Sequence, residues 1–312
     1  MGLVDAGGNI VDRLRTATKE LETPDNVFQH AMEYANAKVP GLGDGEFRLA
    51  AVGVAIPGVL DTTEYVLREV VNLPDWLGIP LLDRLTAISQ LPSVVVNDAN
   101  SAAFAEHNQR NLGKQSLALM TLGTGVGAGV VFGGDPHGGD HGCAGELGHI
   151  AIEFGADALL CTCGSHGHLE SYAGAAGVVA RMKRALSTAD TNSIPACLSG
   201  DITPKDIAEA AGNGYDRATQ IVSETGDYVG RAIGFIGQVA DPAVVLLGGA
   251  MTFGGNTTAT GRMFLESVRQ SVKATTLVQV GENIEIDFAT LGNDAGMLGA
   301  AMLAKNAVGK NL

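Results

Sequence analysis

The chain alternates short apolar runs with longer segments in which apolar residues recur at helical spacing. Short apolar runs are typical of buried strands, and apolar positions three or four apart are typical of helices that bury one face. The pattern predicts strands at 49–57, 94–97, 116–121, 130–132, 243–247 and 283–290, and helices at 24–39, 80–90, 101–110, 172–187, 203–212, 215–238, 262–274 and 294–308. Alternating strands and helices predict an α/β architecture.

Two segments depart from this alternation. Residues 2–18 favour a β-hairpin, because a short apolar strand meets a glycine-rich turn at 5–9 and an alternating strand follows. Residues 71–76 predict a loop in which Trp76 is the aromatic anchor. The long helix at 215–238 carries glycine at 226, 230, 234 and 237, so we expect it to pack closely against a neighbouring element.

Many of the 43 glycines follow predicted strands. Gly123, Thr124 and Gly125 lie in a strand–turn–strand, which lacks the helix that a dinucleotide fingerprint requires. Their successive N–H groups and the threonine hydroxyl suit phosphate oxygens, and Gly248-Gly249 ends a later strand in the same way. Such turns in both halves of the chain suggest a nucleotide bound between two domains. The alternative is a glycine-rich hairpin that only permits a tight bend.

Composition narrows the function classes. The 312 residues are 46% hydrophobic and 17% charged, which fits one large or two medium globular domains. The net charge of −14 argues against general nucleic-acid binding but permits a phosphorylated ligand, which backbone N–H groups bind. No apolar run has membrane-spanning length without polar interruption, and the first residues show no basic and apolar leader pattern. We therefore expect a cytoplasmic protein without a membrane partner.

Asp98 is the strongest candidate for a general base. It follows the strand at 94–97, with amide side chains at Asn97 and Asn100 beside it. A carboxylate in this position can accept a proton from a sugar hydroxyl, while the amides hold neighbouring hydroxyls. The alternative is that Asp98 or Asn100 caps the helix predicted at 101–110. Capping by Asn100 is expected in either case and does not compete with a catalytic Asp98.

Soft metal ligands gather between residues 142 and 170. Two histidines and two cysteines have spacing that suits one tetrahedral Zn²⁺: His149, Cys161, Cys163 and His168. A site closed by four protein ligands is usually structural, so the metal would fix a loop. Glu146 lies in the same stretch and would share one face of a helical turn with His149. The alternative is that these are ordinary loop and core residues.

Taken together, these segments resemble the ROK family of sugar kinases, and most closely its bacterial glucokinases. The resemblance is carried by Gly-Val-Ala-Ile-Pro-Gly (53–58), Asn-Leu-Pro-Asp-Trp (72–76), Asn-Asp-Ala-Asn (97–100), Leu-Gly-Thr-Gly-Val-Gly (122–127), Ala-Gly-Glu-Leu-Gly-His (144–149), Cys-Thr-Cys-Gly-Ser-His-Gly-His-Leu-Glu (161–170), Leu-Gly-Gly-Ala (247–250) and Leu-Gly-Asn-Asp-Ala-Gly-Met-Leu-Gly-Ala-Ala (291–301). These motifs span nearly the whole chain in family order, and the block at 144–170 is the most specific of them.

The resemblance implies an actin-like ATPase fold of the ribonuclease H-like type. Two α/β domains would enclose an interdomain cleft. The smaller domain would comprise residues 1–114 and 295–312, and the larger domain, with the zinc-stabilised loop, would comprise residues 115–294. The family also suggests a homo-oligomer, either a dimer or a tetramer.

The resemblance also assigns roles. Asp98 would activate the sugar 6-hydroxyl for attack on the γ-phosphate of ATP, and Mg²⁺ would accompany the nucleotide. By motif match, the sugar site would comprise Gly58, Asn97, Asp98, Glu146, His149 and Glu170. The nucleotide turns would be Gly123, Thr124 and Gly125, together with Gly248 and Gly249. One ring nitrogen of His149 would bind zinc and the other would face the sugar.

Two departures from the family pattern have consequences. His168 stands where the family has a third zinc cysteine, with Cys143 nearby as a substitute ligand. The family also begins with a strand and an Asp-x-Gly-Gly-Thr phosphate turn, whereas residues 2–18 match the two strands that follow it. Loss of that central strand would expose two neighbouring strand edges. Either the true start lies upstream, or the chain is truncated and binds ATP weakly.

These features predict an ATP-dependent glucokinase. Within the same chemistry, the alternative is a kinase for fructose, mannose or an N-acetylhexosamine. A non-catalytic sugar-binding pseudokinase is the alternative of another class. The DNA-binding repressors of the family carry an added helix-turn-helix segment that is not found here, and the acidic charge agrees with that.

Overall fold

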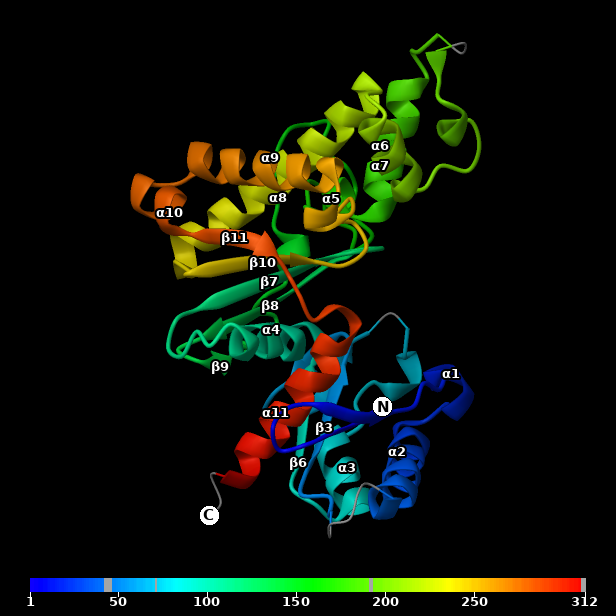
Figure 1. Ribbon diagram of the computed structural model, residues 1–312, viewed down its shortest axis with the longest axis vertical. Helices are drawn as coiled ribbons and strands as arrows, with labels where there is room; N and C mark the ends of the chain where they lie inside the picture. The colour runs from blue at the N-terminus through cyan, green and yellow to red at the C-terminus, as the bar shows by residue number, and fades with distance from the viewer. Residues whose placement is uncertain (42–46, 71, 191–192, 310–312) are drawn as a thin grey trace.

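The computed structural model describes residues 1–41, 47–70, 72–190 and 193–309, so Val71 of the predicted aromatic loop lies outside the described residues. The α/β alternation predicted from the sequence is confirmed, and the elements form two lobes joined along helices α4 and α11 (Figure 1). Among the described residues, no helix is both long enough and apolar enough to cross a membrane.

The lobe drawn uppermost is built on a five-stranded sheet in the order β11-β10-β7-β8-β9. Its strands are β7 (Leu117–Leu122), β8 (Val126–Phe132), β9 (Asp135–Pro136), β10 (Val244–Gly248) and β11 (Glu285–Phe288). The strands β7, β10 and β11 run parallel, whereas β8 returns antiparallel to β7. The predicted strand–turn–strand around Thr124 is therefore confirmed.

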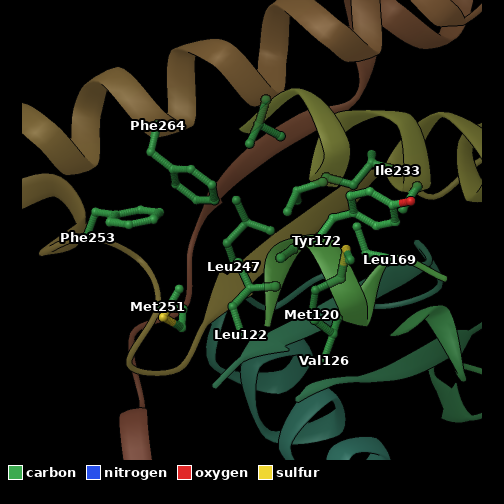
Figure 2. Close-up of a cluster of buried hydrophobic side chains, with 14 of the residues drawn as sticks. Met120, Leu122, Val126, Leu169, Tyr172, Ile233, Leu247, Met251, Phe253 and Phe264 are labelled. Atoms are coloured by element: carbon green, nitrogen blue, oxygen red, sulfur yellow. The ribbon is translucent and has the colours of Figure 1, made fainter. Parts of the chain in front are cut away.

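Helices cover both faces of this sheet (Figure 1). The upper face carries α5 (Glu170–Ala173), α6 (Ala175–Leu186), α7 (Pro204–Gly212), α8 (Asp216–Ala240), α9 (Ala259–Thr275) and α10 (Val278–Asn283). Figure 2 shows how Ile233 of α8 and Phe264 of α9 meet Met120 and Leu247 of the sheet in one buried cluster. The helix predicted at 172–187 is divided at Gly174, where the backbone is extended and ends α5.

The glycines of α8 pack against α9 and α10, as the sequence predicted. A Cβ added at Gly226 would lie 2.6 Å from the Ser267 Cβ, and one added at Gly230 would lie 2.5 Å from the Ser271 Cβ. The absence of side chains thus lets the two helix backbones come close together, which places buried Ser271 against Asp227.

The lower face of the sheet carries α4 (Asp98–Gln109), and α11 (Ala295–Gly309) packs on α4 from the side of the second lobe (Figure 1). Ala103 and Phe104 of α4 are buried against Leu119 of β7 and Leu246 of β10. The prediction placed the start of this helix at residue 101, but it begins at Asp98 because Asn97 ends the strand and caps the helix directly.

The second lobe holds the parallel pair β3 (Val52–Ile56) and β6 (Ser93–Asn97). Its other elements are α1 (Thr18–Leu21), α2 (Pro24–Lys38), α3 (Leu81–Ser89) and the hairpin β4 (Val59–Asp61) with β5 (Val66–Glu69). Trp76 is buried among them and donates its indole N–H to the Glu22 carbonyl at 3.0 Å, so the predicted aromatic anchor is confirmed.

The N-terminal hairpin is also confirmed. It consists of β1 (Gly2–Val4) and β2 (Ile10–Arg13), which pair antiparallel. In the described ranges β1 pairs with β2 alone and β3 pairs with β6 alone, so the second lobe contains separate two-stranded sheets. How the chain divides into domains stays a prediction.

Candidate active site

Asp98 and Asn97 stand where β6 ends and α4 begins. The Asn97 side chain accepts the Asn100 N–H at 3.0 Å and donates to the Gly58 carbonyl at 2.9 Å. Asn97 is thus the helix cap, and the prediction that Asn100 would be the cap is wrong. Asn100 is buried instead. Its side-chain oxygen Oδ1 accepts the Val130 N–H at 3.0 Å, and this hydrogen bond connects the start of α4 to the larger sheet.

The Asp98 carboxyl can be reached from solvent, yet many protein atoms surround it. This desolvation raises its pKa above the ordinary value, although the Ala99 N–H, 2.8 Å from one oxygen, acts in the opposite direction. A carboxylate with a raised pKa and an accessible oxygen is suited to accept a proton. The first turn of α11 lies beside it, because Gly296 adjoins the Asp98 carbonyl.

Glu146 and His149 flank a single 3₁₀ turn (Leu147–His149), close to the expected helical turn, and the His149 N–H donates to the Glu146 carbonyl at 3.0 Å. Desolvation raises the pKa of Glu146, and the nearby His149 lowers it. The carboxylates of Asp98, Glu69 and Glu170 are close enough to raise it further. The structure therefore gathers the predicted sugar-contact side chains around one acidic centre.

The four predicted metal ligands also converge. One donor atom from each of His149, Cys161, Cys163 and His168 lies within 4.8 Å of the others. The His149 Nδ1 is 3.4 Å from the His168 Nδ1 and 3.9 Å from the Cys161 Sγ. Bonds of zinc to nitrogen and sulfur imply tetrahedral edges of about 3.3–3.8 Å, which the two histidine nitrogens match and the His149–Cys161 pair slightly exceeds. Cys143 is not a member of this group.

The surroundings of the four predicted metal ligands favour the protonation states in which histidine and cysteine bind a metal. Burial lowers the pKa of His168, and His149 lowers it further, which favours the neutral imidazole that a metal requires. The pKa of the Cys163 thiol is lowered first by a backbone hydrogen bond from Ser165. In His149 the Nδ1 atom faces the group, which leaves the other ring nitrogen for a different partner.

Glu170 lies between the metal group and the glycine turn. One carboxylate oxygen, Oε2, accepts the Val126 N–H at 3.0 Å, and the other, Oε1, accepts the Thr162 hydroxyl at 3.0 Å. A side chain at Gly125 would overlap Oε2, so any larger residue would displace the carboxylate. The carboxylate thus has partners on both sides and keeps further lone pairs for a ligand.

The two predicted nucleotide turns are adjacent. Thr124 is exposed at the tip of the turn between β7 and β8. Gly249 has a φ of +89° and packs on the Leu122 carbonyl, which also accepts the Met251 N–H at 2.9 Å. Both turns therefore meet at the end of β7, where the Gly123 N–H already donates to the Gly125 carbonyl at 2.9 Å.

Sequence analysis missed two residues of this region, Glu69 and Thr162. Glu69 belongs to a short hairpin that the apolar pattern did not reveal, and its proximity to Glu146 is a tertiary effect. Thr162 stands between two cysteines, a position that could have drawn attention to it. Its contact with Glu170 depends on the folded loop.

The chain is similar in sequence to known sugar kinases. A sequence model of the ROK family matches residues 1–307. The chain is 30% identical over 310 residues to a glucokinase of Halalkalibacterium halodurans, covering 98% of this chain and 91% of that protein. It is also 30% identical over 306 residues to an N-acetylmannosamine kinase of Escherichia coli, covering 97% of this chain and 93% of that protein.

Solved structures agree as well. The crystal structure of a ROK family glucokinase from Streptomyces griseus, in complex with glucose and AMPPNP, matches with a TM-score of 0.73. The two chains are 30% identical, and the match covers 98% of this chain and 95% of that one. The actin-like fold expected from the sequence motifs is thereby confirmed.

Proposed function

Because this chain belongs to the ROK family, we propose that it transfers the γ-phosphoryl group of ATP to the 6-hydroxyl of glucose. The chain is an ATP-dependent hexose kinase. The observation that supports this choice of reaction is the position of Asp98, a desolvated but accessible carboxylate at the start of α4 and close to Glu146.

Asp98 is the general base in this proposal. One of its oxygens takes the proton of the sugar 6-hydroxyl as the hydroxyl oxygen forms a bond to the γ-phosphorus. The bond between that phosphorus and the bridging oxygen breaks, and ADP leaves. Positioning and electrostatic stabilisation supply most of the catalysis in phosphoryl transfer. The raised pKa of Asp98 brings its proton affinity closer to that of the group it deprotonates.

The remaining sugar hydroxyls are bound by side chains that the fold gathers. These hydroxyls form hydrogen bonds with the side chains of Glu146, His149 and Glu170. The remaining N–H of the Asn97 amide donates a further hydrogen bond to the sugar. Gly58 lines the pocket, since its carbonyl fixes the Asn97 amide and a side chain there would overlap the Glu69 carbonyl.

The phosphates of ATP lie against the turn of Gly123, Thr124 and Gly125, where the N–H groups of Thr124 and Gly125 bind them, and the adenosine lies against Gly248 and Gly249. The Gly123 N–H closes the turn instead, since it donates to the Gly125 carbonyl at 2.9 Å. Mg²⁺ neutralises the charge that develops on the phosphates. One Zn²⁺ held by His149, Cys161, Cys163 and His168 fixes the loop that carries the sugar ligands, and its support is the convergence of these four donors.

The test is an assay of ADP release with glucose, ATP and Mg²⁺. Turnover that depends on glucose, and that Asp98→Asn lowers by about a hundredfold to ten-thousandfold, supports the kinase and its base. Glucose binding measured by calorimetry should survive the substitution. Turnover that survives it unchanged excludes Asp98 as the base, and glucose binding without turnover in the wild type identifies a pseudokinase.

A second candidate substrate is N-acetylmannosamine, because a relative of equal identity is named for that sugar. Measuring kcat/KM for glucose, N-acetylmannosamine, fructose and mannose identifies the preferred sugar. A higher value for any sugar other than glucose replaces glucose in the proposal and leaves the reaction class intact.

We also propose a cytoplasmic enzyme that works as a homodimer or homotetramer. The support is the family resemblance together with the need for ATP. Light scattering of the purified chain gives the oligomeric state directly, and a monomeric mass with full activity contradicts the assembly.

A further inference from the structure

The segment 170–175 holds the glycine turn at both of its ends. At one end, the Glu170 carboxylate accepts the Val126 N–H at 3.0 Å. At the other, the Ala175 N–H donates to the Gly123 carbonyl at 2.9 Å. Gly174 packs against the Thr124 carbonyl between them, where an added Cβ would lie 3.0 Å from that oxygen. The first of these contacts, the hydrogen bond to the Val126 N–H, therefore depends on how the Glu170 side chain is oriented.

Thr162 is the residue that orients the other oxygen of Glu170. It lies between Cys161 and Cys163, and its hydroxyl donates to the Glu170 Oε1 at 3.0 Å. The Cys161 thiol is 4.0 Å from the same oxygen. A cysteine that binds a metal does so as the thiolate, which has no proton to donate. With metal bound, the hydroxyl of Thr162 remains as the donor on this side of the carboxylate.

We propose that Thr162 is a positioning residue that orients Glu170 and thereby joins the metal-binding loop to the nucleotide turn. The inference rests on the proposed function, since it takes residues 123–125 as the phosphate turn and Glu170 as a sugar ligand. Thr162 itself touches neither substrate. Its effect on the nucleotide passes through the two oxygens of one carboxylate, from Oε1 at the loop to Oε2 at the Val126 N–H.

Two variants at this exposed position separate the hydroxyl from the side-chain volume. Thr162→Val keeps the shape and removes the donor, whereas Thr162→Ser keeps the donor. We expect Thr162→Val to weaken binding of a non-hydrolysable ATP analogue about tenfold, the typical effect of losing one hydrogen bond to a charged group. The KM for glucose should rise in parallel, and Thr162→Ser should restore both values to near the wild-type level.

The readouts are calorimetric titration with the ATP analogue, zinc content and the melting temperature. Zinc content and melting temperature equal to the wild type, together with weaker nucleotide binding in Thr162→Val alone, support the proposal. Equal nucleotide binding in Thr162→Val and Thr162→Ser overturns it. Loss of zinc in Thr162→Val also overturns it, because the residue would then act by folding the loop.

A double-mutant cycle with Glu170→Gln tests the route. If Thr162 acts through Glu170, Thr162→Val should weaken nucleotide binding much less in the Glu170→Gln background than in the wild type. Additive losses exclude the route through Glu170. Wild-type protein that binds neither the ATP analogue nor glucose refutes the proposed function itself, an outcome that differs from every outcome for the Thr162 variants.

Discussion

The charged form of Asp98 is destabilised by its surroundings. The surrounding protein removes water from the carboxylate, and in return the group gains the proton affinity that a general base needs. The Asn97 side chain caps α4 by accepting the Asn100 N–H. The Asp98 side chain is therefore not needed as the cap and can serve as the base. Adjacent residues thus divide a structural role and a chemical role.

Replacing Asp98 by asparagine should therefore stabilise the protein at neutral pH. The folded-state pKa of Asp98 lies above its ordinary value of 3.8, so its contribution to stability is present below that value and is lost as the pH rises through the folded-state pKa. The gain from Asp98→Asn should be largest near pH 7 and shrink as the pH falls toward 3.8. Urea unfolding across this range measures it. A variant less stable than the wild type at pH 7 contradicts the desolvation argument.

The metal group makes a second prediction at single residues. His168→Ala removes one of four ligands, so zinc content should fall below that of the wild type and the melting temperature should drop by about 5 °C or more. His168→Cys restores a zinc ligand at the same position and should retain the ion. Elemental analysis and calorimetry give both quantities. Wild-type zinc content in His168→Ala shows that His168 is not a ligand.

Much of the candidate site could be predicted at this scale. Asp98, Glu146, His149 and Glu170 were found because motif spacing and strand ends mark them, and the fold gathers them around Glu146. Thr162 was missed because its meaning lies in one contact across a folded loop. A pattern along the chain indicates chemical type, whereas a contact between distant segments depends on the tertiary structure.

At the scale of elements, long periodic segments were predictable, whereas the short hairpin of β4 and β5 was not. The strands β4 and β5 have three and four residues, and their hairpin turns at Tyr65 with a φ of +52°. Helix α10 begins Val-Gln-Val, a sequence that favours a strand, and forms a helix because it packs on the end of α9. Tertiary packing overrode local preference in both cases.

Glycine in α8 is the element-scale feature that stability measurements can test. A Cβ at Gly230 would lie 2.5 Å from the Ser271 Cβ and 2.7 Å from the Val268 carbonyl oxygen, so α9 must move away. We expect Gly230→Val to destabilise the protein by about 2 kcal/mol, since overpacking costs more than the helix gains from losing a glycine.

Chemical denaturation measures the effect of Gly230→Val. Gly200→Val serves as the control, because nothing lies within 4 Å of a Cβ added there, and it should change the free energy of unfolding by less than about 0.5 kcal/mol. Equal effects of the two substitutions show that close helix packing is not the reason for the glycines.

At the scale of the whole molecule, two helices join the lobes. Helix α4 packs on the larger sheet, and α11 packs on α4 and on β3 of the second lobe (Figure 1). Close contact is possible because Gly299 leaves room for the Ser101 carbonyl. Sequence patterns predicted both helices but not this crossing, which depends on contacts between distant residues.

The two lobes differ in how their strands are covered. The described strands of the second lobe form pairs rather than one continuous sheet, and β3 and β6 are mostly only half-buried, whereas β7 and β10 are almost wholly buried. Because parallel sheets are normally covered on both faces, the larger sheet is the more typical core of the two.

Glu106 fixes the connection between the lobes. This fully buried carboxylate on α4 accepts the N–H groups of Thr290 and Leu291 at 2.7 and 2.6 Å and the Thr290 hydroxyl at 3.0 Å. All three donors belong to the segment between β11 and α11. A buried charge without partners costs several kcal/mol, so the carboxylate imposes one conformation on this segment.

Thr290→Val tests the role of the Glu106 hydrogen bonds without removing the Glu106 carboxylate. It takes one donor from a buried carboxylate, so we expect the free energy of unfolding to fall by about 1.5–3 kcal/mol. Amide hydrogen exchange at residues 289–294 should accelerate more than elsewhere, since the loss is local to the connection. Thr86→Val, on the exposed face of α3, should change neither quantity. Exchange at 289–294 that stays as slow as in the wild type, despite a lower free energy of unfolding, would show that the destabilisation arises in the core. Helix packing rather than Glu106 would then hold the lobes together.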